Sequence, residues 1–402
     1  MHKWRTVLAV MWAGLAACGG TDDGGEVVEP LVPVERADFN AKAAEALCER
    51  YARCGLIEDR ERCQEQQLSR GFVQQVGLGT RYDAALASGR IRYDADVAGQ
   101  CVLALREGSC EDSPLSLPML NRGIEYDLQC RFLQGQVADG EACQWSTECS
   151  DGAYCDVTTS SCGGVCKRGT VTHPDTAFDA CPPGTALIPG TTLTGGRCLK
   201  AGGEGTSCGV RGGVLLGICD QGTWCETTTA PHGTCRRVST EGETCDDYHG
   251  PRCGWSLYCR DGRCQKAQGE GAACTAPGTG RFGTLECRDE LFCDGENGQP
   301  GTCRPRREAG AACRNAFECE DTMNCIGAQP MDGVWGTCQP AAREGESCTE
   351  RLCGAFLTCS NTTKTCVATV RLGEPCADPD ACYTSGVCVD GTCRPVGAPS
   401  CG

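Results

Sequence analysis

Apolar residues recur at helical spacing in the segment 38–135. The first run follows Asp38, which is predicted to be the N-cap of a helix, and Gly55 follows the predicted end of this helix. The apolar residues that share one face of this predicted helix are Phe39, Ala43, Leu47, Cys48 and Tyr51. Because residues three and four apart lie on the same helix face, the spacing predicts one inward stripe, which we interpret as core rather than as a cofactor site.

Three further helices are predicted in the same segment. One lies around residues 59–69, and one lies around residues 81–87, where Gly89 follows as a stop. The fourth is predicted to begin after Asp94 as its N-cap and to end at Gly108. The apolar residues on its inward face are Val97, Cys101, Ala104 and Leu105. The segment is therefore predicted to be a small all-α domain.

After this segment the helical period is lost, and signals for short hairpins replace it. The stretch YCRDGRC at 258–264 places Asp261 and Gly262 between two short runs. An Asp-Gly pair tolerates the positive φ that both central residues of a type I′ turn need, so the stretch predicts a tight hairpin. In this hairpin Cys259 faces Cys264 across the two strands. The stretch CVDGTC at 388–393 predicts the same hairpin a second time.

Alignment on these hairpins reveals seven four-cysteine modules, which we number 1 to 7 along the chain. Their first cysteines are Cys143, Cys208, Cys245, Cys274, Cys313, Cys348 and Cys376. The second and third cysteines always enclose five residues, in the pairs Cys149/Cys155, Cys219/Cys225, Cys253/Cys259, Cys287/Cys293, Cys319/Cys325, Cys353/Cys359 and Cys382/Cys388. The fourth cysteines are Cys162, Cys235, Cys264, Cys303, Cys338, Cys366 and Cys393. A spacing that is constant over seven copies indicates a tandem repeat.

Two further features describe each module. A glycine and often an acidic residue precede the first cysteine, as in DGEAC, EGETC and EGESC. The segment between the third and fourth cysteines, which we call the tip, varies from RDGR in module 3 to IGAQPMDGVWGT in module 5. The modules therefore combine a constant frame with a variable tip.

Composition indicates that cross-links, rather than a large apolar core, hold the modules. The 402 residues include 39 Cys and 55 Gly, and only 5% are aromatic. Modules of roughly 30 to 40 residues are too short to bury a stable core of their own. Disulfides, each worth about 2 to 4 kcal/mol in the chain-entropy model, must restrict the unfolded chain instead. Four cysteines allow three pairings, of which we favour first with third and second with fourth, because that pairing clamps the preceding loop onto the hairpin.

The remaining cysteines lie outside the module pattern. Six of them in the segment 38–135 imply three bridges, for which we favour the local pairs Cys54 with Cys63 and Cys101 with Cys110. The other two cysteines of that segment are Cys48 and Cys130. An insert in module 1 and the C-terminus add four cysteines without an assigned partner, namely Cys166, Cys181, Cys198 and Cys401. Cys162 and Cys166 can exchange roles as the fourth cysteine of module 1.

The N-terminal sequence is typical of a lipoprotein signal. Residues 1–17 join a basic start to an apolar run that is too short to span a bilayer. The stretch LAAC at 15–18 resembles the lipobox of bacterial lipoproteins, which implies that Cys18 is lipidated and anchors the chain in a membrane. Gly19, in place of an aspartate, favours the outer membrane. Without Cys18 the 39 cysteines become 38, an even number, as a fully oxidised extracytoplasmic chain requires.

These patterns predict a small disulfide-rich fold in five parts. The parts are the signal peptide 1–17, the lipidated cysteine and flexible tether 18–37, the helical domain 38–135, module 1 with its insert 136–207, and six further modules 208–402. The fold class is therefore an N-terminal all-α cysteine-containing domain followed by a tandem array of short β-hairpin disulfide modules.

The stretch GEACQWSTECSDGAYC at 140–155, with its Gly-acidic lead and Cys-x5-Cys centre, resembles the Dickkopf N-terminal cysteine-rich domain. The plan of lipobox, helical cysteine domain and repeat array is similar to that of large families of myxobacterial surface lipoproteins. The repeat resemblance covers residues 140–395. It implies a disulfide framework and carries over no binding residue.

Charge and missing motifs argue against several functions. A net charge of −16 with a pI near 4.8 repels nucleic acid. The chain has no Cys-x2-Cys and only four His, so the ligand spacing of zinc fingers is absent. His173, His232 and His249 lie in stretches rich in Gly, Pro and Thr, where we interpret them as solvated, and no nucleophile elbow or zinc-protease motif is present. The stretch DGENGQPG from Asp294 lacks the alternating carboxylates of an EF-hand loop. We expect no enzyme activity, no cofactor and no metal site.

The hypothesis that we favour is a surface interaction protein, in which constant frames present variable tips to an unknown protein or surface polymer. Aromatic side chains in rigid loops bind partners at low entropic cost. The candidate partner contacts are Trp224, Trp255, Phe292, Met331 and Trp335, and the alternative for each is packing beside a disulfide. Two other roles remain open for the whole chain: a structural spacer or coat component, and a protease inhibitor that uses one tip as a bait loop.

Overall fold

The structure is a computed structural model that describes most of the chain after residue 31. The described residues are 32–69, 76–116, 119, 123–150, 152–157, 163–168, 184–188, 197–211, 214–227, 232–246, 250–275, 286–296, 298–329, 332–349, 351–354, 356–370, 374–382 and 386–395. The predicted signal peptide and Cys18 lie outside these residues, as does all of the predicted tether before residue 32.

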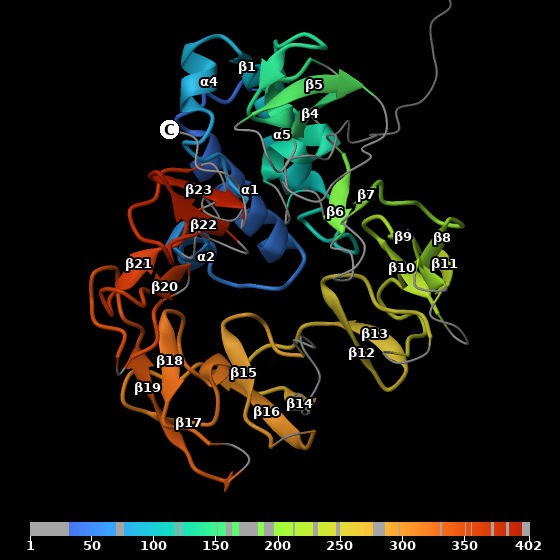
Figure 1. Cartoon of the computed structure of the whole chain (residues 1–402). Coiled ribbons are helices and arrows are strands. Elements are labelled where there is room, and N and C mark those ends of the chain that lie inside the picture. The colour runs from blue at the N-terminus through green and yellow to red at the C-terminus, as the bar shows by residue number, and fades with distance from the viewer. Residues whose placement is uncertain are drawn as a thin grey trace, which may run out of the picture. The chain divides into compact units, whose positions relative to one another are not determined.

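The N-terminal part of the described chain is helical, as predicted (Figure 1). Its helices are α1 (Phe39–Arg53), α2 (Arg60–Ser69), α4 (Asp83–Ala87) and α5 (Ala95–Glu107). The predicted N-cap of α5 is confirmed, since the Asp94 side chain accepts a hydrogen bond of 3.1 Å from the Val97 amide. The same role for Asp38 at α1 is wrong: its backbone is already close to helical, and its carboxylate accepts no capping hydrogen bond.

Helix α1 packs against α5 around an aromatic core. Phe39 is fully buried, and its ring centroid lies 4.3 Å from that of Phe132. A short antiparallel pair of strands, β1 (Ile91–Tyr93) and β2 (Leu133–Gly135), completes the domain, so the domain is mainly helical and not all-α as predicted. The single turns η1 (Ile124–Tyr126) and η2 (Leu128–Cys130) lie just before β2. The apolar stripe that the sequence predicts on one face of α1 is therefore part of the buried core.

The three disulfides of the helical domain differ from the predicted local pairs. The observed bridges are Cys48–Cys63, Cys54–Cys110 and Cys101–Cys130. The prediction relied on short separation along the chain. In the fold, Cys48 lies on the buried face of α1 that meets α2, whereas Cys54 follows the end of α1 and points to the loop after α5. Helix packing, rather than sequence distance, selects the partners.

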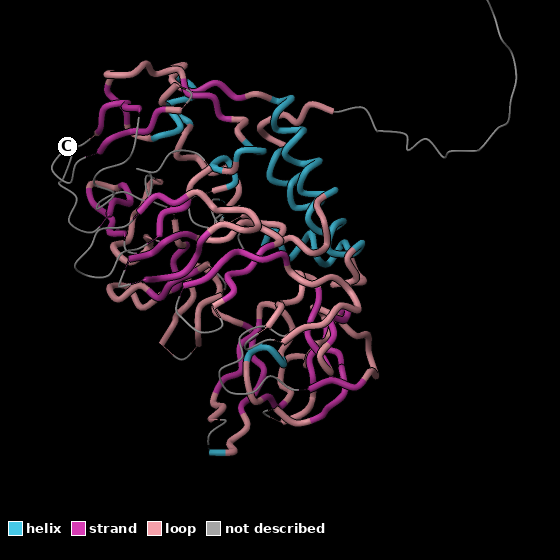
Figure 2. The backbone as a smooth tube through the Cα atoms, turned by 90° about the vertical axis from the view of Figure 1, so that its right-hand side faces the viewer, coloured by secondary structure: helices cyan, strands magenta, loops and turns pink. Residues whose placement is uncertain are grey.

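The seven modules are small antiparallel sheets, as predicted. Module 1 contains β3 (Ala142–Cys143), η3 (Ser146–Glu148), β4 (Ala153–Val157) and β5 (Gly164–Arg168), and its insert contains β6 (Ala186–Ile188) and β7 (Arg197–Leu199). Module 2 contains β8 (Ser207–Arg211), β9 (Val214–Gly217), β10 (Thr223–Glu226) and β11 (His232–Arg237). Module 3 contains β12 (Leu257–Arg260) and β13 (Arg263–Lys266), and module 4 contains β14 (Ala273–Thr275), β15 (Leu291–Cys293) and β16 (Pro300–Pro305). Module 5 contains β17 (Ala312–Cys313), η4 (Ala316–Glu318), β18 (Met323–Ile326) and β19 (Gly336–Pro340). Module 6 contains β20 (Leu357–Cys359) and β21 (Cys366–Ala368), and module 7 contains β22 (Gly386–Val389) and β23 (Thr392–Pro395). Figure 2 shows these strands as short pieces joined by loops.

The predicted hairpin geometry is confirmed at both Asp-Gly turns. Asp261 and Gly262 have φ values of 52° and 72°, and the turn at 390–391 has values of 50° and 75°. Across the first hairpin Cys259 lies opposite Cys264 in the strand register, as expected for a type I′ turn. The two facing sulfurs do not bond to each other, because each is bonded to a cysteine of the preceding loop.

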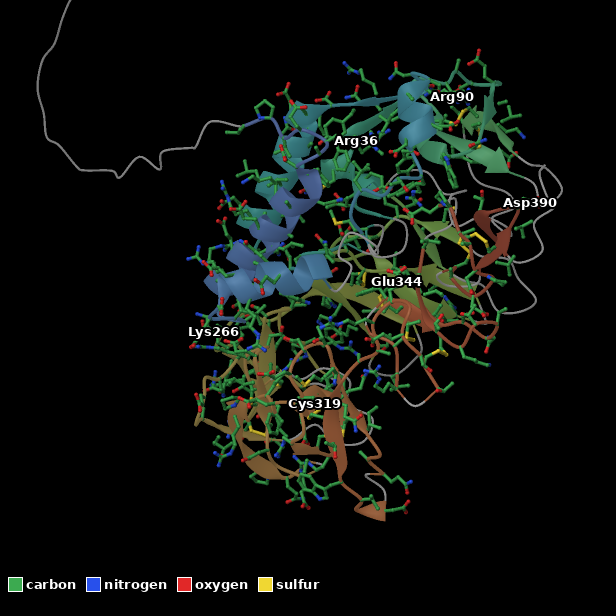
Figure 3. All side chains as sticks on the ribbon, turned by 90° about the vertical axis from the view of Figure 1, so that its left-hand side faces the viewer. Arg36, Arg90, Lys266, Cys319, Glu344 and Asp390 are labelled. Atoms are coloured by element: carbon green, nitrogen blue, oxygen red, sulfur yellow. A yellow bond between two sulfur atoms is a disulfide. The ribbon has the colours of Figure 1, made fainter. Side chains whose placement is uncertain are left out.

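The favoured pairing, first cysteine with third and second with fourth, is confirmed with the assigned cysteines in modules 2 to 7, and in module 1 it holds with the alternative fourth cysteine in place of Cys162. In module 1 the bridges are Cys143–Cys155 and Cys149–Cys166, so Cys166 takes the fourth place. The bridges of modules 2 to 4 are Cys208–Cys225, Cys219–Cys235, Cys245–Cys259, Cys253–Cys264, Cys274–Cys293 and Cys287–Cys303. Those of modules 5 to 7 are Cys313–Cys325, Cys319–Cys338, Cys348–Cys359, Cys353–Cys366, Cys376–Cys388 and Cys382–Cys393. Figure 3 shows such bridges as yellow bonds among the side chains. Cys198 is also disulfide-bonded, while Cys162, Cys181 and Cys401 lie outside the described residues.

In modules 1 to 6, where the structure describes it, the Gly-acidic lead before the first cysteine is a tight turn that closes the module. In module 5 Gly310 has a φ of 85°, and its amide donates to the Cys338 carbonyl at 2.8 Å. The Cys338 amide in turn donates to the Ala311 carbonyl at 2.8 Å. In module 3 the acidic member, Glu243, accepts a hydrogen bond of 2.7 Å from the Thr240 amide, which holds the pKa of its carboxyl below the usual range. The lead is therefore structural.

Candidate interaction surface

Exposed apolar side chains are prominent in module 5. Phe317 is 73% exposed, Val334 46% and Trp335 49%. Phe317 lies in the turn η4, where the Asn315 side chain accepts a hydrogen bond of 2.9 Å from the Phe317 amide. The other two belong to the tip of the module, between its third and fourth cysteines. Large exposed aromatics on a stapled frame are the chemistry that we predicted for a partner contact.

Two arginines hold the ring of Trp335 in place. The guanidinium carbon of Arg314 lies 5.4 Å from the centroid of this ring, and that of Arg307 lies 5.7 Å from it. Both arginines pair with Glu318, at 2.5 Å for Arg314 and 3.2 Å for Arg307, and the Glu318 carboxylate is almost fully buried. Arg307 also lies over Phe292, 5.1 Å from its centroid. The ladder of alternating rings and cations fixes an exposed Trp side chain, so little entropy is lost when a partner contacts it.

The other predicted contacts lie in different surroundings. Phe292 is only 8% exposed and packs under Arg307, so it is a buried support of the ladder and not a surface contact. Trp224 is partly buried, with Arg252 5.8 Å from its ring centroid. Its indole nitrogen is shielded and has no hydrogen-bond partner, which disfavours a role as an open contact. Met331 lies outside the described residues.

Trp255 contacts the helical domain. Its ring centroid lies 5.3 Å from that of Tyr51 on α1, and its amide donates to the Glu111 carbonyl at 2.8 Å. Burial raises the pKa of Tyr51 to about 12, because the phenolate would lose its water. Trp255 remains 42% exposed, so this ring is covered on one side only.

The sequence missed the residues that position these rings. Arg307, Arg314 and Glu318 carry no motif, since charged residues in loops are ordinary and their convergence depends on how modules 4 and 5 meet. Phe317 has a local signal for its turn alone, because an Asn side chain favours a turn by accepting from the backbone amide two residues later.

Several arrangements could suggest metal or catalytic chemistry. Groups of three cysteine sulfurs, such as those of Cys143, Cys149 and Cys166, lie within 4.8 Å of one another in most modules. All of these sulfurs are in disulfides, which removes the thiolates that a metal needs. The Asp294 carboxylate accepts from the Thr302 amide at 2.6 Å and pairs with Arg304, which lowers its pKa. This carboxylate therefore stabilises the hairpin of module 4.

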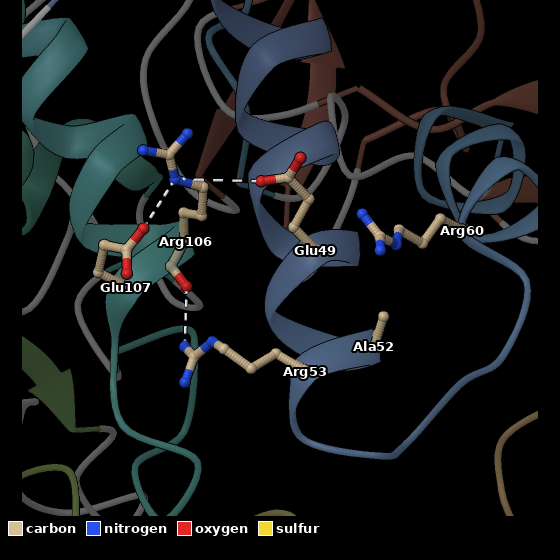
Figure 4. Close-up of a pocket in the computed structure, with 6 residues that line it drawn as sticks. All are labelled: Glu49, Ala52, Arg53, Arg60, Arg106 and Glu107. Carbon is tan, nitrogen blue, oxygen red and sulfur yellow. Dashed lines mark hydrogen bonds and ion pairs between the residues drawn. The ribbon is translucent and has the colours of Figure 1, made fainter. Parts of the chain in front are cut away.

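One hollow of about 400 Å³ lies beside α1 and α5 (Figure 4). Its lining residues are Glu49, Ala52, Arg53, Arg60, Arg106 and Glu107. Arg106 lies between Glu107, at 2.9 Å, and Glu49, at 4.0 Å, while Arg53 donates to the Arg106 carbonyl at 2.9 Å. These charges largely satisfy one another, and the lining contains no nucleophile. His232 is the first residue of β11 with a buried Nδ1, and so it is not the solvated loop residue that we expected.

Comparisons with protein families, with curated proteins and with solved structures give no match for this chain. Within the part of the chain that the structure describes, no helix has the length and apolar character needed to cross a membrane. The many disulfides indicate an oxidising, extracytoplasmic environment.

Proposed function

We propose that the protein is a lipid-anchored, extracytoplasmic interaction protein without catalytic activity, and that module 5 carries its partner contact. The observation that carries this proposal is Trp335, which is half exposed and is held by two arginines. Phe317 and Val334 are further exposed apolar residues of the same module. A rigid, exposed indole on a disulfide frame fits a protein or a surface polymer. The partner is not nucleic acid, because a net charge of −16 repels it.

The anchor in this proposal is Cys18. The LAAC stretch before it and the even cysteine count without it support lipidation, and Gly19 supports the outer membrane. The acidic, glycine-rich tether after it would give the folded part distance from the bilayer.

A purely structural spacer is the less favoured role. In a spacer, length comes from modules that follow one another without turning back. Here modules 3 and 4 contact the helical domain, through the Trp255 amide and through the Asp289 amide, which donates to the Leu56 carbonyl at 2.9 Å. An array that returns to its own first domain loses length and gains a defined shape.

The test is cross-linking in intact cells with the full-length, lipidated protein. We expect Trp335→Ala to lower partner recovery by about tenfold, since a central aromatic contact contributes about 1.4 kcal/mol or more. Leu352→Ala is the matched control, because Leu352 is a 62% exposed apolar side chain in module 6. Equal recovery with the two variants would contradict the assignment of the contact to module 5.

A further inference from the structure

Modules 3, 4 and 5 contact the helical domain through a small set of directed interactions. In module 3 the amides of Trp255 and Ser256 donate to the carbonyls of Glu111 and Cys110, at 2.8 and 3.2 Å. In module 4 the Asp289 amide donates to a carbonyl of the loop between α1 and α2. These bonds join backbone to backbone, so they specify a docked position.

Charged side chains surround the contact with modules 4 and 5. Glu58, in the loop after α1, pairs with Arg288, and its amide donates to the Glu290 carboxylate at 2.9 Å. Arg62 on α2 lies 3.7 Å from Asp321 of module 5. The Asp321 carboxylate also forms an ion pair of 2.7 Å with Arg306, and the Asp321 side chain is only 7% exposed. The contact is therefore rich in ion pairs.

The helical domain offers two loops to the array, and one disulfide joins them. Residues 54–58 follow α1, residues 108–112 follow α5, and the Cys54–Cys110 bridge ties the first loop to the second. In the contacts described here, the partners in modules 3 to 5 follow the second cysteine of the module by one to three positions, as Trp255 follows Cys253 and Asp289 follows Cys287. In modules 3 to 5 the Cys-x5-Cys segment thus faces the helical domain.

Module 1 joins the helical domain in a different way. Trp145 packs against the apolar core of that domain, and its ring lies 6.4 Å from Tyr82. Arg90 pairs with the buried Glu148 at 2.7 Å, next to this contact (Figure 3 labels Arg90). Among the described residues, the apolar clusters around the disulfides of modules 1, 4 and 5 each hold residues of their own module alone. Module 1 therefore adds the Trp145 ring to the core of the helical domain, whereas the contacts of modules 3 to 5 described above are polar groups and one ring pair.

We propose that modules 3 to 5 dock reversibly on the helical domain, so that Tyr51 of this domain covers one side of Trp255 in the docked state. In the closed state Trp255 and Tyr51 cover each other. In the open state both rings face solvent, and a partner that binds the open face shifts the chain toward that state. The stability of the closed state depends on ionic strength, because Glu58 is 70% exposed and salt screens its ion pair with Arg288.

The experiment is hydrogen exchange on the full-length, oxidised protein. The amides of Trp255, Ser256 and Asp289 report docking, since their acceptors belong to the helical domain. The amides of Gly310 and Cys338 report the integrity of a module, since their acceptors belong to module 5 itself. We expect about 1 M salt to speed exchange at the docking amides by about tenfold and to leave the internal amides unchanged.

Charge reversal gives the matched test. Glu58→Arg should speed exchange at the docking amides by about fivefold at low salt, and the double variant Glu58→Arg with Arg288→Glu should restore protection. Glu61→Arg is the control, because Glu61 is exposed on α2 and makes the same change of charge. The proposal is overturned by docking amides that respond neither to salt nor to Glu58→Arg, or by internal amides that accelerate together with them.

Discussion

The Cys54–Cys110 bridge should have two separable effects, one on the stability of the helical domain and one on docking. Its cysteines are 56 residues apart, so the chain-entropy model assigns its loss a cost of about 4 kcal/mol. The Cys101–Cys130 bridge, with a separation of 29, is worth about 3.5 kcal/mol in the same model. Because the remaining bridges already restrict the unfolded chain, both measured costs should lie below these values and should differ little.

Docking should separate the two variants. Cys54→Ala with Cys110→Ala frees the two loops that accept from Trp255 and Asp289, so exchange at these amides should rise by more than the loss of global stability explains. The variant without Cys101–Cys130 leaves the two loops tied. Each double substitution removes a pair, so no unpaired thiol is created.

The assay is denaturant unfolding of the oxidised chain, followed by far-ultraviolet circular dichroism, together with hydrogen exchange under native conditions. Equal local acceleration at the docking amides in the two variants would refute the reasoning, since it would show that the bridge between the loops has no special part in docking.

Three further predictions concern single residues. Gly310→Ala should lower the free energy of unfolding by about 1 kcal/mol, measured by denaturant titration, because a φ of 85° is unfavourable for a residue with a Cβ even though the space there is open. Burial raises the pKa of the Glu290 carboxyl in the docked state, so docking should become more stable as the pH falls through this raised pKa and less stable toward neutral pH. Protection of the Asp289 amide from exchange measures this stability, and Glu290→Gln should abolish its dependence on pH. Burial raises the pKa of Tyr51 from its ordinary value of about 10 to about 12, so docking should weaken as the pH rises above about 10. Trp255→Ala should lower the pKa of Tyr51 toward the ordinary value in an ultraviolet absorbance titration.

Local patterns of the sequence were enough for the helices and for the module frame. The Asp261-Gly262 turn follows from backbone sterics alone, and the constant five-residue spacing follows from the need to bring two bridges onto one hairpin. The end of α5 at Gly108 and the cap at Asp94 are also local, since hydrogen bonds within a few residues decide them.

The candidate surface was only partly predictable. Trp335 was named from the sequence, but Phe292, chosen on the same ground, is buried. Side-chain type cannot distinguish the two, because exposure depends on which neighbour covers the ring: Arg307 lies over Phe292 in one module and only braces Trp335 in the next.

The sequence by itself determined the repeat and its hairpins, because both depend on contacts within about 20 residues. It left three cysteine pairings open in each module, of which the structure contains the favoured one. It did not determine the bridges of the helical domain or the return of modules 3 to 5 to that domain. The Cys54–Cys110 bridge and the hydrogen bond from the Asp289 amide to the Leu56 carbonyl can form only after the helices and modules have packed. Contacts across such distances leave no periodic trace in the sequence, so only the tertiary structure decides them.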